Sequence, residues 1–344
     1  MTRTLKTLTA LADADLLGEA DDAALRAVAA RYAIGVTPAL TELMNGADRA
    51  DPIHRQFIPS AGELITTPEE RADPIGDHAH EPVPGLIHRY PDRVLLKIVS
   101  VCPVYCRFCF RREMVGPGKE TTMSASDLTA ALDYIRSNSG IWEVILTGGD
   151  PFMLSPARAR AITEALEAIE HVKIIRWHTR MPVADPSRIT DDYAAAVSSA
   201  KKAVYVAVHT NHAKELTAES VASCRRLHRA GITLVSQSVL LRGVNDDFDT
   251  MADLMRTLVA SGIKPYYLHQ LDYAPGTSHF RVPLREAQAL VQRLRDELSG
   301  LCQPTFVIDI PGGVSKAVAS LNDIAPVDDG HKVRGRDGAW RDYD

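Results

Sequence analysis

The feature that most constrains the fold of this chain is a regular alternation of strand-like and helix-like segments. Apolar runs rich in β-branched and aromatic residues recur along the chain: RVLLKIVS (93–100), WEVILT (142–147), VKIIRWHT (172–179), AVYVAVHT (203–210), TLVSQSVL (233–240) and KPYYLHQL (264–271). Helix-like stretches such as SASDLTAALDYIRS and SPARARAITEALEAIE separate them. Continuous apolar strands joined by helices are typical of a parallel sheet with helical cover. The pattern therefore predicts an α/β fold, either an open doubly wound sheet or a partial (β/α) barrel.

The segments outside this alternation suggest three regions. Residues 1–75 show helical periodicity, for example in DAALRAVAARYA, so we expect an N-terminal helical arm there. The sheet domain is expected over 76–320 and a C-terminal tail over 321–344. No apolar run reaches membrane-spanning length, and acidic residues come too early in the N-terminal segment for a secretory signal. We therefore expect a cytoplasmic protein without a membrane partner.

The charge balance argues against a nucleic acid partner. The formal net charge is −5, and acidic and basic residues are interspersed along the chain. A nucleic-acid-binding surface would need a concentration of lysine and arginine that this sequence does not show.

Three of the five cysteines, Cys102, Cys106 and Cys109, follow the first strand-like run. In a reducing compartment such a cluster suits metal ligation better than disulfide bonding. A closed zinc site needs a fourth ligand, and nearby histidines could supply it: His78, His80 and His88. An iron–sulfur cube on three thiolates would instead leave one iron open for a small molecule. A non-catalytic zinc-binding interaction module therefore stays open beside an iron–sulfur enzyme.

Polar motifs follow other strand-like runs as well. TGGDP comes after the second run, HTN lies at the end of the fourth, SQS lies in the fifth and HQLD ends the sixth. In α/β folds the carboxyl ends of parallel strands meet at one edge and gather active-site residues. We therefore expect these motifs and the cysteines to share one site.

The cysteine spacing, with an aromatic residue before the last cysteine, resembles the signature of the radical S-adenosylmethionine superfamily. Four further motifs narrow the resemblance to the lysine 2,3-aminomutase family over about residues 50–320: PVPGLIHRYPDRVLL, SQSVLLRGVND, HQLDYAPGTSHFRVP and IDIPGGVSK. The resemblance implies a partial (β/α)6 barrel of radical S-adenosylmethionine type. It also implies an isomerase that converts L-α-lysine to β-lysine with a 4Fe-4S cluster, S-adenosylmethionine and pyridoxal 5′-phosphate (PLP).

The resemblance further implies roles for individual residues. The three cysteines would hold the cluster, and Lys316 would be the catalytic lysine that bonds to PLP. The other PLP-binding residues would be Arg89, Tyr90 and Arg93. S-adenosylmethionine would contact Phe108, Gly148, Gly149, Asp150, His209 and Gln237, with the missing glycine side chains letting the backbone approach the methionyl group.

Substrate choice would rest on three residues by the same resemblance. Arg111 matches the residue that binds the amino acid's carboxylate, and Asp272 and Asp309 match the pair that binds lysine's distal ammonium. Because two carboxylates around an empty pocket repel each other, we expect a raised pKa for at least one of them.

The chain departs from the longer family members in one respect. Those carry a cysteine at the position of Asp247 and a C-terminal cysteine cluster that together bind zinc between subunits, whereas no cysteine follows Lys316 here. The interfacial zinc is therefore not expected, and a homo-oligomer is left open. A shorter branch makes (R)-β-lysine for attachment to elongation factor P, and the sequence leaves this role open beside free metabolism. The implied partners are free lysine and an electron donor such as flavodoxin or ferredoxin.

Overall fold

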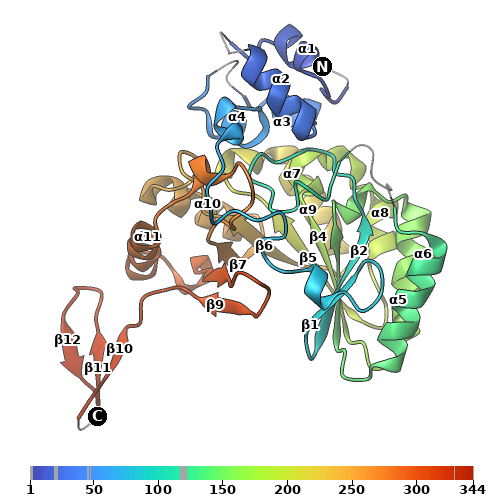
Figure 1. Cartoon of the computed structure of the whole chain (residues 1–344). Coiled ribbons are helices and arrows are strands. Elements are labelled where there is room, and N and C mark those ends of the chain that lie inside the picture. The colour runs from blue at the N-terminus through green and yellow to red at the C-terminus, as the bar shows by residue number, and fades with distance from the viewer. Residues whose placement is uncertain are drawn as a thin grey trace.

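The computed structural model describes residues 3–18, 22–44, 46, 48–116, 122–328 and 330–343, and its main element is a curved nine-stranded sheet (Figure 1). The strands are β1 (Leu86–Tyr90), β2 (Arg93–Val99), β3 (Glu143–Gly148), β4 (Ile174–Thr179), β5 (Ala203–His209), β6 (Thr233–Val239), β7 (Lys264–His269), β8 (Thr305–Asp309) and β9 (Lys316–Val318). Neighbours from β2 to β8 pair in parallel, whereas β1 and β9 pair antiparallel at the two edges.

The order of the strands distinguishes between the two α/β folds that the sequence left open. The strands follow one another across the sheet in chain order. A doubly wound sheet reverses its strand order at a switch point, and this sheet does not. The crossovers therefore all run in one direction, and the sheet curls into a partial barrel, which confirms the predicted fold class. The six predicted strands correspond to β2 through β7, and β8 adds a seventh parallel strand that the sequence analysis did not include.

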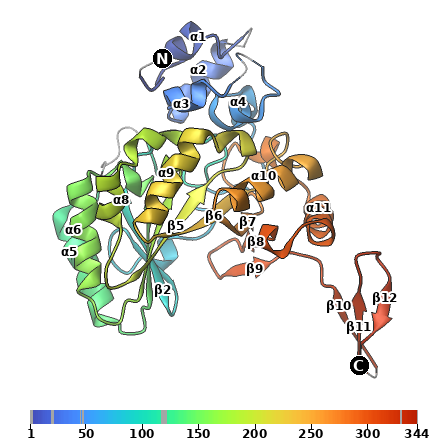
Figure 2. The ribbon, with the colours of Figure 1, turned by 180° about the vertical axis from the view of Figure 1, so that it is seen from behind.

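Helices cover the outer face of the sheet (Figures 1 and 2). They are α5 (Ala125–Ser137), α6 (Pro156–Glu167), α7 (Met181–Ala184), α8 (Asp191–Val197), α9 (Ala218–Arg229), α10 (Phe248–Ala260) and α11 (Leu284–Glu297). Side chains that accept a hydrogen bond from the first turn define several of their starts, as Ser124 does for α5 and Asp247 for α10. The largest apolar cluster includes Leu146, Trp177 and Leu254, all fully buried. Burial of each such side chain stabilises the fold by about 1.5–3 kcal/mol.

The N-terminal helices form a separate layer above the carboxyl ends of the strands (Figure 1, blue). They are α1 (Leu8–Asp13), α2 (Asp22–Arg31), α3 (Pro38–Thr41) and α4 (Pro52–Phe57). Leu40, Ile53 and Phe57 are fully buried in a second apolar cluster that this layer forms with Val104 and Ala184. No helix in the described ranges is both long and apolar enough to cross a membrane.

The segment after β9 forms a small antiparallel sheet that projects from the barrel (Figure 2). Its strands are β10 (Ile324–Val327), β11 (Gly330–Arg334) and β12 (Trp340–Asp342). Arg334 in β11 pairs with Asp323 at 3.0 Å and with Asp296 of α11 at 3.7 Å. These ion pairs help to hold the small sheet beside α11.

Candidate active site

A cavity of about 450 Å³ lies inside the curve of the main sheet, and every site residue predicted from the sequence lines it. The set comprises Arg89, Tyr90, Arg93, Cys102, Cys106, Phe108, Cys109, Arg111, Gly148, Gly149, Asp150, His209, Gln237, Asp272, Asp309 and Lys316. These residues come from both edges of the sheet and from the strands between them. The cavity therefore brings together motifs that are more than two hundred positions apart in the chain, as the 226 positions between Tyr90 and Lys316 illustrate.

The cysteine loop follows β2 and is anchored from behind by a buried ion cluster. Arg107, within the loop, donates to both oxygens of the Glu63 carboxylate at 3.0 and 3.1 Å and to the carbonyl of Ala33 at 2.7 Å. Arg112 donates to the same carboxylate, which is fully buried. The loop is thus fixed on its far side, and Cys102, Cys106 and Cys109 line the cavity on its near side.

The three thiols are free of disulfide bonds, and burial raises the pKa of each, that of Cys106 to about 11. Iron supplies the positive charge that lets a buried thiol ionise and bind. Among the residues that the structure describes, no three His, Cys, Asp or Glu side chains converge closely enough to hold one metal ion. The three thiols line one cavity, which suits an iron–sulfur cluster because each thiolate of such a cluster binds a different iron.

The histidines considered as zinc ligands lie away from these thiols. His88 forms a hydrogen bond through Nδ1 with the Tyr134 hydroxyl at 2.9 Å, and His78 pairs with Asp73 at 3.0 Å. Neither these two nor His80 lines the cavity. The structure therefore does not bring these three histidines into the cavity that the cysteines line.

The glycines at the end of β3 also have a structural role, beside the predicted contact with S-adenosylmethionine. Gly148 has a φ of +115°, and a Cβ on Gly149 would lie 2.4 Å from the carbonyl oxygen of Val101. The Gly149 amide donates to the Val99 carbonyl at 2.6 Å. The missing side chains thus let the end of β3 pack against the start of the cysteine loop. Asp150 continues this contact, since its amide donates to Val101 at 2.9 Å while its carboxylate accepts from the Thr179 hydroxyl at 2.6 Å.

Histidines with unpaired ring nitrogens line the middle of the cavity. His209 on β5 lies opposite Gln237 on β6 in the strand register. Its buried Nε2 has no hydrogen-bond partner. Burial and the positive charge of Arg180 lower the pKa of His209 to about 3. His178 on β4 packs edge-on against His209 at a ring distance of 5.5 Å, and burial lowers its pKa as well. Both imidazoles are therefore neutral near pH 7, and their Nε2 atoms are available to a ligand.

Lys316 and the residues expected to bind PLP lie together at the edges of the sheet. The backbone amide of Lys316 donates to the Tyr90 hydroxyl at 2.8 Å, and the Arg93 guanidinium stacks 3.7 Å above the Tyr90 ring. Arg93 also donates to Asp92 at 2.7 Å. Tyr90 is thus fixed on two sides, and it holds the start of β9, where Lys316 lies.

The two aspartates that are expected to bind the substrate differ in charge state. Lys316 Nζ donates to Asp309 Oδ2 at 2.6 Å, and His269 Nδ1 lies 3.3 Å from the same carboxylate. Although burial opposes ionisation, these two partners hold the pKa of Asp309 below its usual range. Burial and then the negative charge of Asp309 raise the pKa of Asp272 to about 7. The expected repulsion within the acidic pair is therefore confirmed.

Arg111 is oriented by a residue that the sequence analysis missed. Its Nη1 donates to the Thr147 hydroxyl and its Nη2 to Asp77 Oδ2, both at 3.1 Å. Asp77 Oδ1 accepts from Arg89 Nη2, also at 3.1 Å. No motif marks Asp77 or His178 in the sequence, whereas His269 lies in the HQLD motif and could have been included.

Comparisons with known proteins agree with this geometry. Residues 96–255 match the Radical SAM superfamily model. The chain is 41% identical over 291 residues to L-lysine 2,3-aminomutase of Clostridium subterminale, covering 84% of this chain and 69% of that protein. It is 36% identical to the enzyme of the same name from Buchnera aphidicola (85% of each chain) and 35% identical to that of Escherichia coli K12 (84% of each chain). A solved radical SAM methyltransferase from Sphaerobacter thermophilus is similar at a TM-score of 0.46, with 22% identity over 65% of this chain and 68% of that chain.

The cysteine loop, the family model and the identity to the aminomutases define a radical S-adenosylmethionine enzyme. Within that superfamily, the chain belongs to the lysine 2,3-aminomutase family. It is an isomerase whose cofactors are a 4Fe-4S cluster, S-adenosylmethionine and PLP. The residues present fit these groups, because the cavity holds free thiols, neutral histidines with unpaired nitrogens, and arginines with unpaired Nε atoms around Lys316.

Proposed function

We propose that this protein is an L-lysine 2,3-aminomutase, which moves the amino group of L-α-lysine from C2 to C3 to give β-lysine. The observation that carries the proposal is that Asp272 and Asp309 line the cavity that also holds the three thiols and Lys316. A buried ammonium needs opposite charge and filled hydrogen bonds, which an acidic pair supplies. A relative that acts on glutamate would have no use for this pair.

The structure of the acidic pair supports a lysine side chain as its ligand. Asp309 already binds an ammonium group, that of Lys316, at 2.6 Å. This contact supports an ammonium group as the ligand of Asp309, and the distal ammonium of substrate lysine would supply one. The incoming charge would also lower the pKa of Asp272 from about 7 and complete the pair as two carboxylates around one cation.

We assign the remaining contacts as follows. Arg111 binds the carboxylate of the amino acid, and Arg89, Tyr90 and Arg93 hold PLP beside Lys316. Cys102, Cys106 and Cys109 hold the cluster, and the residues expected to bind S-adenosylmethionine are Phe108, Gly148, Gly149, Asp150, His209 and Gln237. When bound, the cluster with S-adenosylmethionine supplies radical hydrogen-atom abstraction and PLP supplies a carrier for the migrating nitrogen. The chain itself fixes positions and excludes water from the reacting atoms.

The partners proposed beyond lysine are an electron donor such as flavodoxin or ferredoxin and a second copy of the chain, in the cytoplasm. Exposed apolar residues on the projecting C-terminal sheet support a homo-oligomer: Ile324, Val327 and Trp340, each at least 40% exposed. Light scattering of the purified protein tests this, with a monomer mass as the contrary result. Free metabolism and elongation factor P modification both stay open, and an (R)-β-lysine product would favour the second.

An anaerobic assay tests the proposed function. Protein reconstituted with iron, sulfide, PLP and S-adenosylmethionine is reduced and incubated separately with lysine and glutamate, and products are identified by mass and chiral chromatography. We expect β-lysine from lysine and little β-glutamate. An enzyme that isomerises glutamate and leaves lysine unchanged would overturn the proposal. A colourless protein with stoichiometric zinc would instead support the interaction-module alternative.

A further inference from the structure

One buried carboxylate connects the two arginines that are proposed to bind different anions. Asp77 Oδ1 accepts from Arg89 Nη2 and Asp77 Oδ2 accepts from Arg111 Nη2, each at 3.1 Å. Asp77 is 1% exposed, and both guanidinium side chains are less than 10% exposed. Because each oxygen serves a different arginine, the position of Asp77 sets both the separation and the orientation of the two guanidinium groups.

The two guanidinium groups keep unused hydrogen-bonding capacity. Arg89 donates from Nη2 to the Ile75 carbonyl at 2.6 Å, and Arg111 donates from Nη1 to Thr147, yet the Nε atom of each is buried without a hydrogen-bond partner. A buried donor without a hydrogen-bond partner is unfavourable, so a ligand that accepts from it would be stabilising. In addition, Arg89 and Arg111 share the single carboxylate of Asp77. The Asp309 carboxylate lies 3.9 Å from Arg89, but it is already paired with Lys316. The cluster is therefore incomplete without an anionic ligand.

The loop that carries Asp77 also supports the loop that leads to Lys316. Gly76 has a φ of +66°, and a Cβ there would lie 2.5 Å from the carbonyl carbon of Gly312. A Cβ on Gly313 would lie 2.7 Å from the Ile75 oxygen. The two loops pack backbone against backbone, which allows little relative movement. The segment from Ile75 to Asp77 thus contacts Arg89, Arg111 and the approach to Lys316.

We propose that Asp77 is a positioning residue shared by two anion sites, the Arg89 site for the phosphate of PLP and the Arg111 site for the carboxylate of the amino acid. The proposal rests on the proposed function. The amino acid reacts while it is joined to PLP, so the distance between its carboxylate and the phosphate has to match the distance between the two guanidinium groups. Asp77 fixes that distance from behind, without touching either ligand.

Binding measurements on unreduced enzyme, in which no turnover occurs, test the proposal. In Asp77→Asn, two guanidinium groups are left facing an amide that carries no charge, so they repel each other and lose their fixed orientation. We expect the dissociation constants of PLP and of lysine both to rise by about 10- to 100-fold, the size typical of a misplaced or unsupported binding group. Asp77→Glu keeps the charge, and both constants should rise less than in the Asn variant. Asp133→Asn, which removes an exposed carboxylate on α5, serves as the matched control and should change neither constant.

A double-mutant cycle separates positioning from general structural support. Arg89→Lys should weaken lysine binding in the wild-type background, because Asp77 is then held by one arginine fewer, and it should have little further effect in Asp77→Asn. The shared role is wrong if Asp77→Asn changes only one of the two dissociation constants. It is also wrong if Asp77→Asn and Arg89→Lys lower the melting temperature while the binding of PLP and lysine stays normal. A wild-type enzyme that binds PLP but not lysine would instead overturn the proposed function.

Discussion

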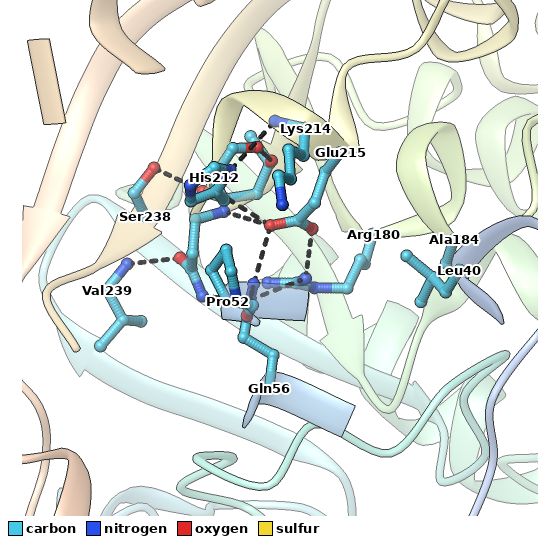
Figure 3. A network of polar contacts seen from close by, with 12 residues as sticks. Leu40, Pro52, Gln56, Arg180, Ala184, His212, Lys214, Glu215, Ser238 and Val239 are labelled. Carbon is cyan, nitrogen blue, oxygen red and sulfur yellow. Dashed lines mark hydrogen bonds and ion pairs between the residues drawn. The ribbon is translucent and has the colours of Figure 1, made fainter. Parts of the chain in front are cut away.

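Two buried clusters of arginine and carboxylate contribute residues to the lining of the cavity, and they differ in how completely their atoms are paired. The first, here called the arm junction, consists of Gln56, Arg180, Asn211 and Glu215 and joins the N-terminal layer to the barrel (Figure 3). Arg180 donates to Glu215 Oε2 at 2.6 Å, and Gln56 donates to Glu215 Oε1 at 3.2 Å. No buried side-chain nitrogen or oxygen of these four residues lacks a hydrogen-bond partner.

The second cluster surrounds Asp77 and Lys316, and its pairing is incomplete. Arg89 and Arg111 each keep an unpaired Nε, and the pKa of Asp272 is raised to about 7. Both clusters are buried and pair arginine with carboxylate side chains, so the presence of such pairs does not distinguish support from binding. For these two clusters, the difference teaches that unpaired atoms lie where we propose that ligands bind, whereas the fully paired cluster joins two parts of the fold.

The largest expected effect concerns the cysteine loop, which lines the same cavity. Cys106→Ala should abolish the intact 4Fe-4S cluster and all turnover, because one thiolate ligand is lost. The protein should still fold, since the Glu63 ion cluster anchors the loop from its other side. Iron and sulfide analysis with a lysine assay checks this. Continued isomerisation of lysine by the variant would contradict the assignment of the loop.

At the arm junction, Glu215→Gln should destabilise the protein with little effect on lysine binding. The change leaves the buried Arg180 charge without its carboxylate, which typically costs about 3–5 kcal/mol of unfolding free energy. Lys214→Ala removes an ion pair with Asp51 whose lysine is half exposed, and it should cost no more than about 1 kcal/mol. Urea unfolding and lysine binding measure both variants. If Glu215→Gln had a normal unfolding free energy and weakened lysine binding, the arm junction would serve binding and not structural support.

At the binding cluster the same kind of change should have the opposite result. Asp272→Asn and Asp309→Asn each remove charge at nearly constant volume and leave the distal ammonium half compensated. We expect kcat/KM for lysine to fall by about 30- to several thousand-fold, equivalent to about 2–5 kcal/mol. Cluster content should stay normal, and an amino acid without a distal positive charge should be affected much less. Wild-type efficiency in both variants would make the acidic pair a structural feature of the loops.

The smallest expected effect is a pH dependence that only the incomplete cluster should show. Lysine binding needs Asp272 ionised, so kcat/KM for lysine should rise as the pH increases from 6 to 8 and level off above the pKa of about 7. Asp272→Asn should lose this step. Since the pKa of Asp272 is higher in the folded chain than its usual value of 3.8, the ligand-free protein should also lose some stability as the pH rises from about 4 to 7.

Much of the fold could be predicted from the sequence because parallel strands buried on both faces are continuous apolar runs. That signal gave β2 through β7 and the helices between them. It missed β8, which has only five residues, and β9, which has three. The strands from β10 to β12 lie in a polar segment that we expected to be a tail, and their pairing depends on contacts within a sheet whose strands are mostly exposed.

The candidate site was predictable only where a short motif carried it. The cysteines, Lys316 and the acidic pair came from the family resemblance, and the structure brings all of them to one cavity. Asp77 lies in no such motif. Its role depends on contacts with Arg89 and Arg111, which lie 12 and 34 positions away in the chain. Whether a buried charge is fully paired depends on these distant contacts, so the difference between the two clusters could not be predicted from the sequence.

The most direct test of this account is to locate PLP on the chain. Enzyme loaded with PLP is reduced with borohydride and digested, and the peptide that carries the pyridoxyl mass is sequenced. We predict that the label lies on Lys316, the lysine whose Nζ donates to Asp309 at 2.6 Å within the incomplete cluster. Lys264 and Lys202 lie outside the cavity and donate to backbone carbonyls. A label on either of them, with none on Lys316, would contradict the central claim that this charged end of the cavity is where PLP and the amino acid meet.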